Sequence, residues 1–105
     1  MAPIEILVVD DELDIEDLIL GKFRKQIRIG KFQFYFAYSG RDALTLLQDH
    51  PEITIVMTDI RMPEMDGLTL LEHLHHDYPL VRPVVATAYA DYDNMRRALK
   101  LGVYD

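Results

Sequence analysis

The sequence contains no cysteine, which excludes disulfides, zinc–thiolate sites and thiol nucleophiles. It has no apolar run long enough to cross a membrane, and Met1–Ala2–Pro3 leads into an apolar segment without the pattern of a signal peptide. Neither of the glycine-rich patterns GxxxxGK(S/T) and GxGxxG occurs, which argues against a nucleotide or flavin site. We therefore expect a soluble, cytoplasmic protein without membrane contacts.

Basic residues are scarce relative to acidic ones: 11 lysines and arginines face 18 aspartates and glutamates, which gives a formal charge of −7. An excess of negative charge disfavours direct binding of nucleic acid by this domain. Some of the basic residues cluster around the end of the first predicted helix. They are Lys22, Arg24, Lys25, Arg28 and Lys31. We interpret them as a solvated helix face, because the helix dipole favours cations near a helix C-terminus.

The length of 105 residues fits one domain, spanning 1–105, and 50% hydrophobic residues suffice for a core. Short apolar or aromatic runs alternate with segments of helical periodicity. The predicted strands are Ile4–Val9, Phe32–Tyr38, Ile53–Asp59 and Val84–Thr87. Alternation of this kind indicates an α/β fold with a doubly wound parallel sheet and right-handed crossovers.

The helices are predicted from apolar residues three and four positions apart. The first helix carries Ile15, Leu18, Ile19, Phe23 and Ile27, and a short second one carries Ala43, Leu44 and Leu47. The third begins at Gly67 with Leu68, Leu71 and Leu74 facing inward, and a fourth, capped by Asp91, carries Met95, Ala98, Leu99 and Gly102. Period two places four aromatic side chains on one face of the second strand, where we expect them in the core: Phe32, Phe34, Phe36 and Tyr38.

Three predicted strands end in polar residues, namely Asp10–Asp11, Asp59 and Thr87. If these strands are neighbours, the side chains converge at the carboxyl edge of the sheet, where ligands bind in open parallel sheets. Two charges about 4 Å apart repel by roughly 4 kcal/mol at an effective dielectric of 20, so such a cluster needs protons or a cation. Carboxylate oxygens suit Mg²⁺. An aspartate beside Mg²⁺ can attack a phosphoryl group, to which the Thr87 hydroxyl can donate.

The motifs carry the interpretation further. In order along the chain they are Ile6–Glu12, Asp59–Gly67, Val84–Ala88 and Ala98–Asp105. Together they resemble the receiver domain of two-component response regulators. The resemblance spans the whole chain, and every motif stands in the order of that family.

The resemblance implies a role for each residue of the site. Asp59 is the expected phosphoacceptor, phosphorylated by a histidine kinase in a Mg²⁺-dependent reaction. Asp11 and Asp59 are expected to bind Mg²⁺ directly, together with the backbone carbonyl of Arg61. Asp10 is expected to hold a metal-bound water, and the Thr87 hydroxyl to bond the phosphoryl group.

The resemblance also implies fold and partners. Receivers have a flavodoxin-like strand order 2-1-3-4-5, whereas this chain stops at Asp105, before the fifth strand and its lysine. We therefore expect a C-terminally truncated receiver of order 2-1-3-4, lacking the fifth strand and fifth helix, with self-association at the exposed edge of the fourth strand. The implied partners are a sensor histidine kinase or phosphotransfer protein and an output domain or effector. Such a domain is not an enzyme in the usual sense.

The main alternative is a pseudo-receiver that binds partners without phosphorylation. A phosphatase of the haloacid dehalogenase type would need an aspartate two residues after its nucleophile, where this chain has Arg61. His73, His75 and His76 lie near a helix C-terminus without a cysteine partner, so a metal site there is disfavoured.

Overall fold

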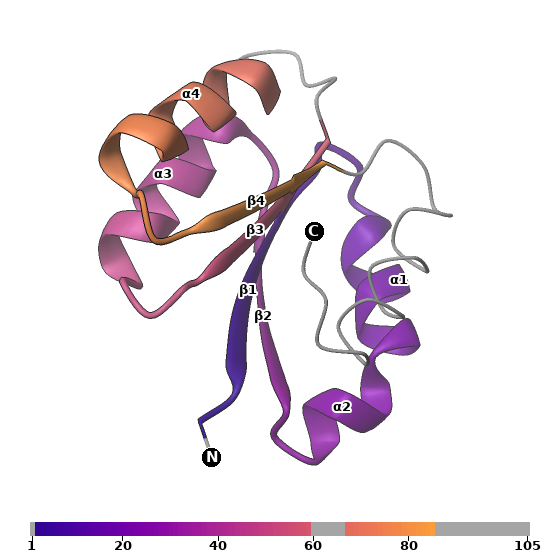
Figure 1. Cartoon of the computed structure of the whole chain (residues 1–105). Coiled ribbons are helices and arrows are strands. Elements are labelled where there is room, and N and C mark those ends of the chain that lie inside the picture. The colour runs from indigo at the N-terminus through magenta and orange to yellow at the C-terminus, as the bar shows by residue number, and fades with distance from the viewer. Residues whose placement is uncertain (1, 60–66, 86–105) are drawn as a thin grey trace.

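The structure is a computed structural model that describes residues 2–59 and 67–85 (Figure 1). Four parallel strands form one sheet in the order β2-β1-β3-β4. Their bounds are Ile4–Val9 for β1, Phe32–Ala37 for β2, Ile55–Thr58 for β3 and Arg82–Val85 for β4. The predicted α/β class and the strand order 2-1-3-4 are confirmed.

Helices cover both faces of the sheet (Figure 1). They are α1 Ile15–Lys22, α2 Arg24–Arg28, α3 Gly40–Asp49 and α4 Gly67–Asp77. The helices α1 and α2 pack on one face and α3 and α4 on the other. None of the helices within residues 2–59 and 67–85 is long and apolar enough to cross a bilayer. The helix expected after Asp91 lies outside the described residues.

The face under α1 and α2 is aromatic. Phe23 and Phe32 are almost fully buried there, and Phe34 and Phe36 pack against the same cluster. The ring centroids of Phe23 and Phe32 lie 5.7 Å apart in an edge-on arrangement, which suits the quadrupoles of the rings. These three aromatic residues of β2 therefore serve the core, as predicted. Tyr38 follows the strand, and its hydroxyl donates a hydrogen bond of 2.6 Å to Glu16 Oε2.

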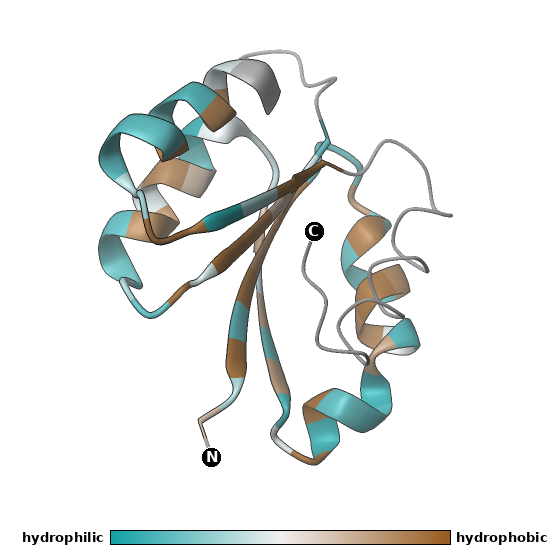
Figure 2. Ribbon diagram, in the orientation of Figure 1, coloured by the Kyte–Doolittle hydropathy of each residue, from teal (hydrophilic) through white to brown (hydrophobic). Residues whose placement is uncertain are grey.

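The opposite face is aliphatic, with Leu7 and Val9 of β1 in one buried cluster with residues of α3 and α4. Brown segments of the ribbon in Figure 2 mark hydrophobic residues along the strands and helices. Leu70 and Leu74 of α4 are buried, while Leu71 is only partly buried. The prediction was correct for Leu74 and in part for Leu71, which packs against the same cluster, and it missed Leu70. The predicted Leu68 lies outside the described side chains. Residues four apart lie on the same side of a helix, so Leu70 and Leu74 together define the buried stripe of α4.

The single helix predicted through Ile27 was wrong, because the chain breaks at Phe23. This residue has φ −109° and ψ 20°, outside helical geometry, and separates α1 from α2. Hydrogen bonds continue on both sides: the Phe23 N–H donates to the Ile19 carbonyl, and the Ile27 N–H donates to the Phe23 carbonyl. Phe23 is fully buried against the rings of β2, and this packing outweighs the propensity for a continuous helix.

Candidate functional site

The candidate site forms where β1 and β3 end beside each other. Val9 of β1 pairs with Thr58 of β3, so Asp10 and Asp59 leave the sheet at the same edge. The strand hydrogen bonding extends one step further, since the Asp59 N–H donates to the Val9 carbonyl at 3.0 Å. On the other side, the Asp10 N–H donates to the Ala37 carbonyl at 3.0 Å. Backbone pairing therefore fixes where both side chains start.

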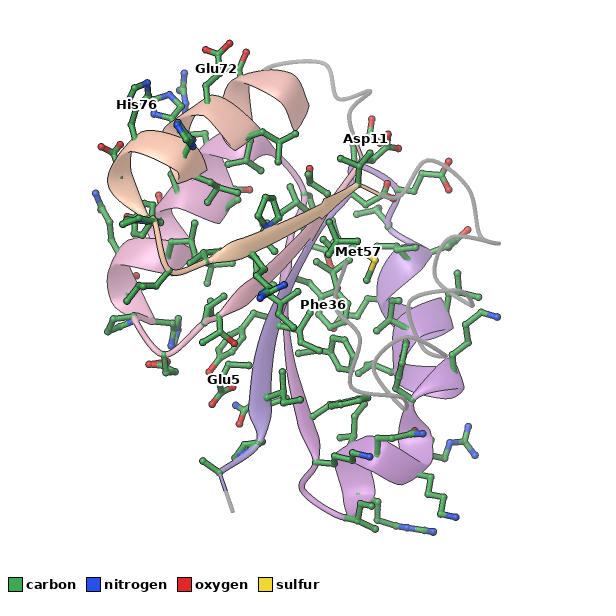
Figure 3. All side chains as sticks on the ribbon, viewed as in Figure 1. Glu5, Asp11, Phe36, Met57, Glu72 and His76 are labelled. Carbon is green, nitrogen blue, oxygen red and sulfur yellow. The ribbon has the colours of Figure 1, made fainter. Side chains whose placement is uncertain are left out.

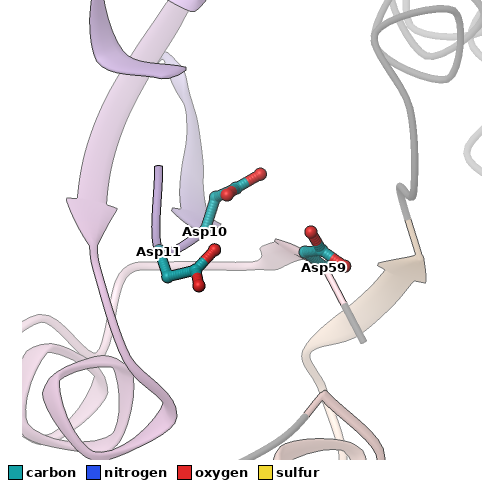
Figure 4. Close-up of side chains that lie close together, drawn as sticks. All are labelled: Asp10, Asp11 and Asp59. Carbon is teal, nitrogen blue, oxygen red and sulfur yellow. The ribbon is translucent and has the colours of Figure 1, made fainter. Parts of the chain in front are cut away.

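Three carboxylates meet at this edge (Figure 4). One oxygen each from Asp10, Asp11 and Asp59 lies within 4.8 Å of the other two. No other group of three metal-ligating side chains comes as close within the described ranges 2–59 and 67–85. Asp10 is buried, Asp59 is partly buried and Asp11 is exposed. The predicted convergence of these three residues is thus observed.

Short polar contacts hold the site in place. The Glu12 N–H donates to Asp10 Oδ1 at 3.0 Å, the local bond that aspartate makes to the backbone two residues on. Thr58 is fully buried, and its hydroxyl donates to the Asp59 carbonyl at 3.0 Å. We did not predict either contact, although an aspartate directly after a strand is a known signal for the first.

The donor set fits a hard divalent cation. All three side chains offer oxygen, and like charges at this spacing are favoured only when a cation or protons neutralise them. Mg²⁺ usually binds through one or two carboxylates and keeps several waters, which agrees with one exposed and one partly buried ligand. The other two predicted site residues, Arg61 and Thr87, lie outside the described residues.

Comparison with known proteins places this geometry in a family. The family model for the response regulator receiver domain matches residues 6–105. The chain belongs to the receiver domain family of two-component response regulators. Receiver domains are parts of signalling regulators rather than classical enzymes.

Individual relatives agree with the family match. The receiver is 37% identical to the regulatory protein AtoC of Escherichia coli over 101 residues, which cover 95% of this chain and 21% of AtoC. A receiver domain protein from Clostridium thermocellum has 28% identity and a TM-score of 0.64, with 95% of this chain and 77% of that chain covered. The chain spans about a fifth of the length of the curated relatives it matches.

A more distant structure shows the fold alone. It is the co-crystal structure of the Saccharomyces cerevisiae phosphotransfer protein Ypd1 with the receiver domain of Ssk1. The identity is 22% and the TM-score 0.66, and the match covers 99% of this receiver and 77% of that chain.

Proposed function

We propose that this receiver accepts a phosphoryl group on Asp59 from a histidine kinase or phosphotransfer protein, in a Mg²⁺-dependent reaction, and thereby switches an output. The observation that carries the proposal is the meeting of Asp59 with Asp10 and Asp11 within 4.8 Å at the carboxyl edge of the sheet. That edge is where open parallel sheets place their chemistry.

The proposed step is an in-line displacement on phosphorus. A carboxylate oxygen of Asp59 forms the new P–O bond while the P–N bond of the donor phosphohistidine breaks, and the departing imidazole nitrogen keeps the electron pair of that bond. The backbone bond from the Asp59 N–H to the Val9 carbonyl holds the nucleophile in position. The Thr87 hydroxyl would donate to a phosphoryl oxygen.

Four residues would hold the metal in this proposal. Asp11, Asp59 and the Arg61 carbonyl would be direct ligands, and Asp10 would act through a water. When bound, Mg²⁺ supplies positive charge that offsets the charge of the phosphoryl oxygens. The Glu12 N–H supports this role, because it fixes Asp10 Oδ1 and so orients the Asp10 carboxylate.

The proposal extends to partners and location. The yeast Ssk1 receiver, which has this fold, forms a complex with the phosphotransfer protein Ypd1. The curated relatives are several times longer than this chain, which supports an output domain or effector acting with the domain 1–105. The cytoplasm is the location that we propose for this signalling step. Self-association along β4 stays a prediction, supported by Val85, which is 44% exposed.

Phosphorylation can be tested directly on Asp59. The protein is incubated with Mg²⁺ and a small phosphodonor, and the adduct is located by mass spectrometry after borohydride trapping. We expect one acyl phosphate, on Asp59, that is lost in Asp59→Asn. The control is Asp49→Asn, which changes an exposed aspartate at the end of α3 and should leave labelling intact. Label on Asp59→Asn at the wild-type level would refute the proposal.

The same experiment distinguishes a phosphorylated receiver from the alternative, a pseudo-receiver. A pseudo-receiver would form no acyl phosphate at any Mg²⁺ concentration while still binding its partner. In that case the acidic cluster would act only in metal binding or recognition.

A further inference from the structure

Charge is unevenly distributed along the chain. No acidic residue occurs between Asp17 and Asp42, although the chain as a whole carries a formal charge of −7. Five of the 11 lysines and arginines lie within this interval between positions 22 and 31. One end of the molecule is therefore basic, and the rest is strongly acidic.

The basic end is a defined surface on α2, which we name the basic patch. Its cations are exposed, and their nitrogens gather around α2 in Figure 3. Ile29 lies among them and is 62% exposed. The basic patch consists of Arg24, Lys25, Arg28, Ile29 and Lys31.

Backbone bonds hold this patch against the amino ends of the strands. The Lys31 N–H donates to the Gln26 carbonyl at 2.8 Å, and the Ile4 N–H donates to the Lys31 carbonyl at 2.9 Å. The patch is therefore part of the folded framework. In Figure 1 it lies at the end of the molecule that carries the N-terminus, away from the start of α1.

The start of α1 has the opposite character, and we name it the acidic pole. Its carboxylates are exposed and follow the end of β1, near the labelled Asp11 in Figure 3. Leu13 lies among these carboxylates in the sequence and is 76% exposed. The acidic pole consists of Asp11, Glu12, Leu13, Asp14 and Asp17.

The two surfaces are complementary in both charge and apolar content. Each has one exposed aliphatic side chain, Ile29 or Leu13, surrounded by charges of one sign. The residues of the two surfaces that are nearest in sequence, Asp17 and Arg24, have six residues between them, whereas Leu13 and Ile29 are sixteen positions apart and lie at opposite ends of the α1–α2 segment. Both surfaces are exposed and can therefore contact a second molecule.

We propose that the basic patch of one copy of this chain binds the acidic pole of another, so that copies associate head to tail. A second copy fits better than a membrane or a nucleic acid. The exposed Ile29 within the basic patch requires an apolar side chain among the negative charges of the partner, which a nucleic acid backbone does not offer. The acidic pole of a second copy offers both, since its carboxylates surround Leu13, which can contact Ile29.

Head-to-tail contact has a consequence for assembly. The interface joins two different surfaces, so each copy can bind one neighbour at each end, and assembly continues unless a ring closes. A twofold contact along β4 would instead stop at a dimer. The proposal does not depend on phosphorylation of Asp59.

Two charge-reversed variants test the geometry. The first is Lys25→Glu/Arg28→Glu in the basic patch, and the second is Asp14→Lys/Asp17→Lys in the acidic pole. All four side chains are exposed. Each variant alone loses one of the two surfaces, so it should form no head-to-tail chain and should sediment as nothing larger than a dimer paired along β4. An equimolar mixture keeps one matched pair of surfaces and should regain one head-to-tail contact between the two variants, without the continued head-to-tail growth expected of the wild type.

Wild-type association should depend on salt and on the two aliphatic side chains. In sedimentation velocity, the apparent dissociation constant should rise roughly tenfold from about 50 mM to about 300 mM NaCl, because contact between charges is screened. Ile29→Ser and Leu13→Ser should each weaken association to a similar extent. The matched control is Arg41→Glu, an exposed reversal on α3 outside both surfaces, which should associate as the wild type does. Circular dichroism verifies that each variant is folded.

Several results would overturn the proposal. They are a wild type that stays monomeric at low salt, association that is insensitive to salt and to the reversals, or a mixture of the two variants that stays monomeric. Binding of wild type to anionic vesicles or duplex DNA without self-association would assign the basic patch to a polyanion instead.

Discussion

In β1 and β3, the residues inside the strands and the residues just past the strand ends have opposite physical character: the first are apolar and buried, and the second are charged. In the middle, Val8 and Met57 are fully buried and face each other across the β1–β3 pair. Just past the ends, Asp10 and Asp59 carry charge and form one acidic cluster with Asp11. The middle stabilises the fold through burial, whereas the end concentrates like charges that oppose it. The residues proposed for function thus bring mutual charge repulsion rather than apolar burial to the folded state.

The largest effect on stability should come from a substitution inside a strand. Met57→Ala removes a fully buried side chain from the cluster that contains Phe23 and Phe32, so it should lower the free energy of unfolding by about 2–5 kcal/mol. Urea denaturation monitored by circular dichroism measures the change. The control, Leu80→Ala, alters a residue that is 91% exposed and should change stability by less than about 0.5 kcal/mol. Equal losses in the two variants would show that burial does not decide stability here.

At the acidic cluster past the strand ends, the free energy of unfolding should depend on Mg²⁺ rather than on packing. A wild-type protein at a Mg²⁺ concentration about ten times its dissociation constant should gain roughly 1.4 kcal/mol by mass action. Asp11→Asn should gain much less, since it removes a proposed ligand, and without Mg²⁺ it should be at least as stable as wild type because one carboxylate is neutralised. Thermal melts of both proteins with and without Mg²⁺ measure this. An equal Mg²⁺ gain in both would exclude Asp11 as a ligand.

Tyr38 also follows a strand, but we expect it to stabilise the fold and to have no part in phosphorylation or metal binding. Its hydroxyl donates to Glu16 Oε2 at 2.6 Å and so connects the end of β2 to α1. Tyr38→Phe should cost about 0.5–1 kcal/mol at neutral pH and leave Asp59 labelling and Mg²⁺ binding unchanged. Chemical denaturation and the phosphodonor assay together test this. Loss of labelling with unchanged stability would move Tyr38 into the functional site.

The pH dependence of this bond has a definite sign. The hydrogen bond to Glu16, followed by burial and the charge of Glu16, raises the pKa of Tyr38 above its ordinary value of 10.0. A pKa raised by folding means that the contribution is complete below pH 10.0 and is lost as the pH rises through the folded pKa. The stability difference between wild type and Tyr38→Phe should therefore shrink only in that alkaline range. A difference that shrinks between pH 6 and 8 would point to another group.

Much of the molecule was predictable from local pattern. The alternation of apolar runs with helical periods predicted four strands in a parallel sheet, and β1 has the predicted bounds Ile4–Val9. The resemblance to receiver domains supplied the strand order 2-1-3-4. The acidic residues after two strands predicted the cluster of Asp10, Asp11 and Asp59. Arg61 and Thr87 stay predictions, because they lie outside the described residues.

Only the tertiary structure decided the break at Phe23, the burial of Leu70 and the distance between the ends of β1 and β3. The helical period from Ile15 to Ile27 is unbroken in sequence, yet packing of Phe23 on Phe32 and Phe34 interrupts the helix. The helical periodicity of apolar residues shows which of them lie on the same side of a helix. The strands and helices packed against that helix decide which of these residues are buried and where the helix is interrupted. The sequence by itself determined which residues end the strands, and the pairing of Val9 with Thr58 brought those ends together, because hydrogen bonding between strands far apart in sequence forms only in the folded chain.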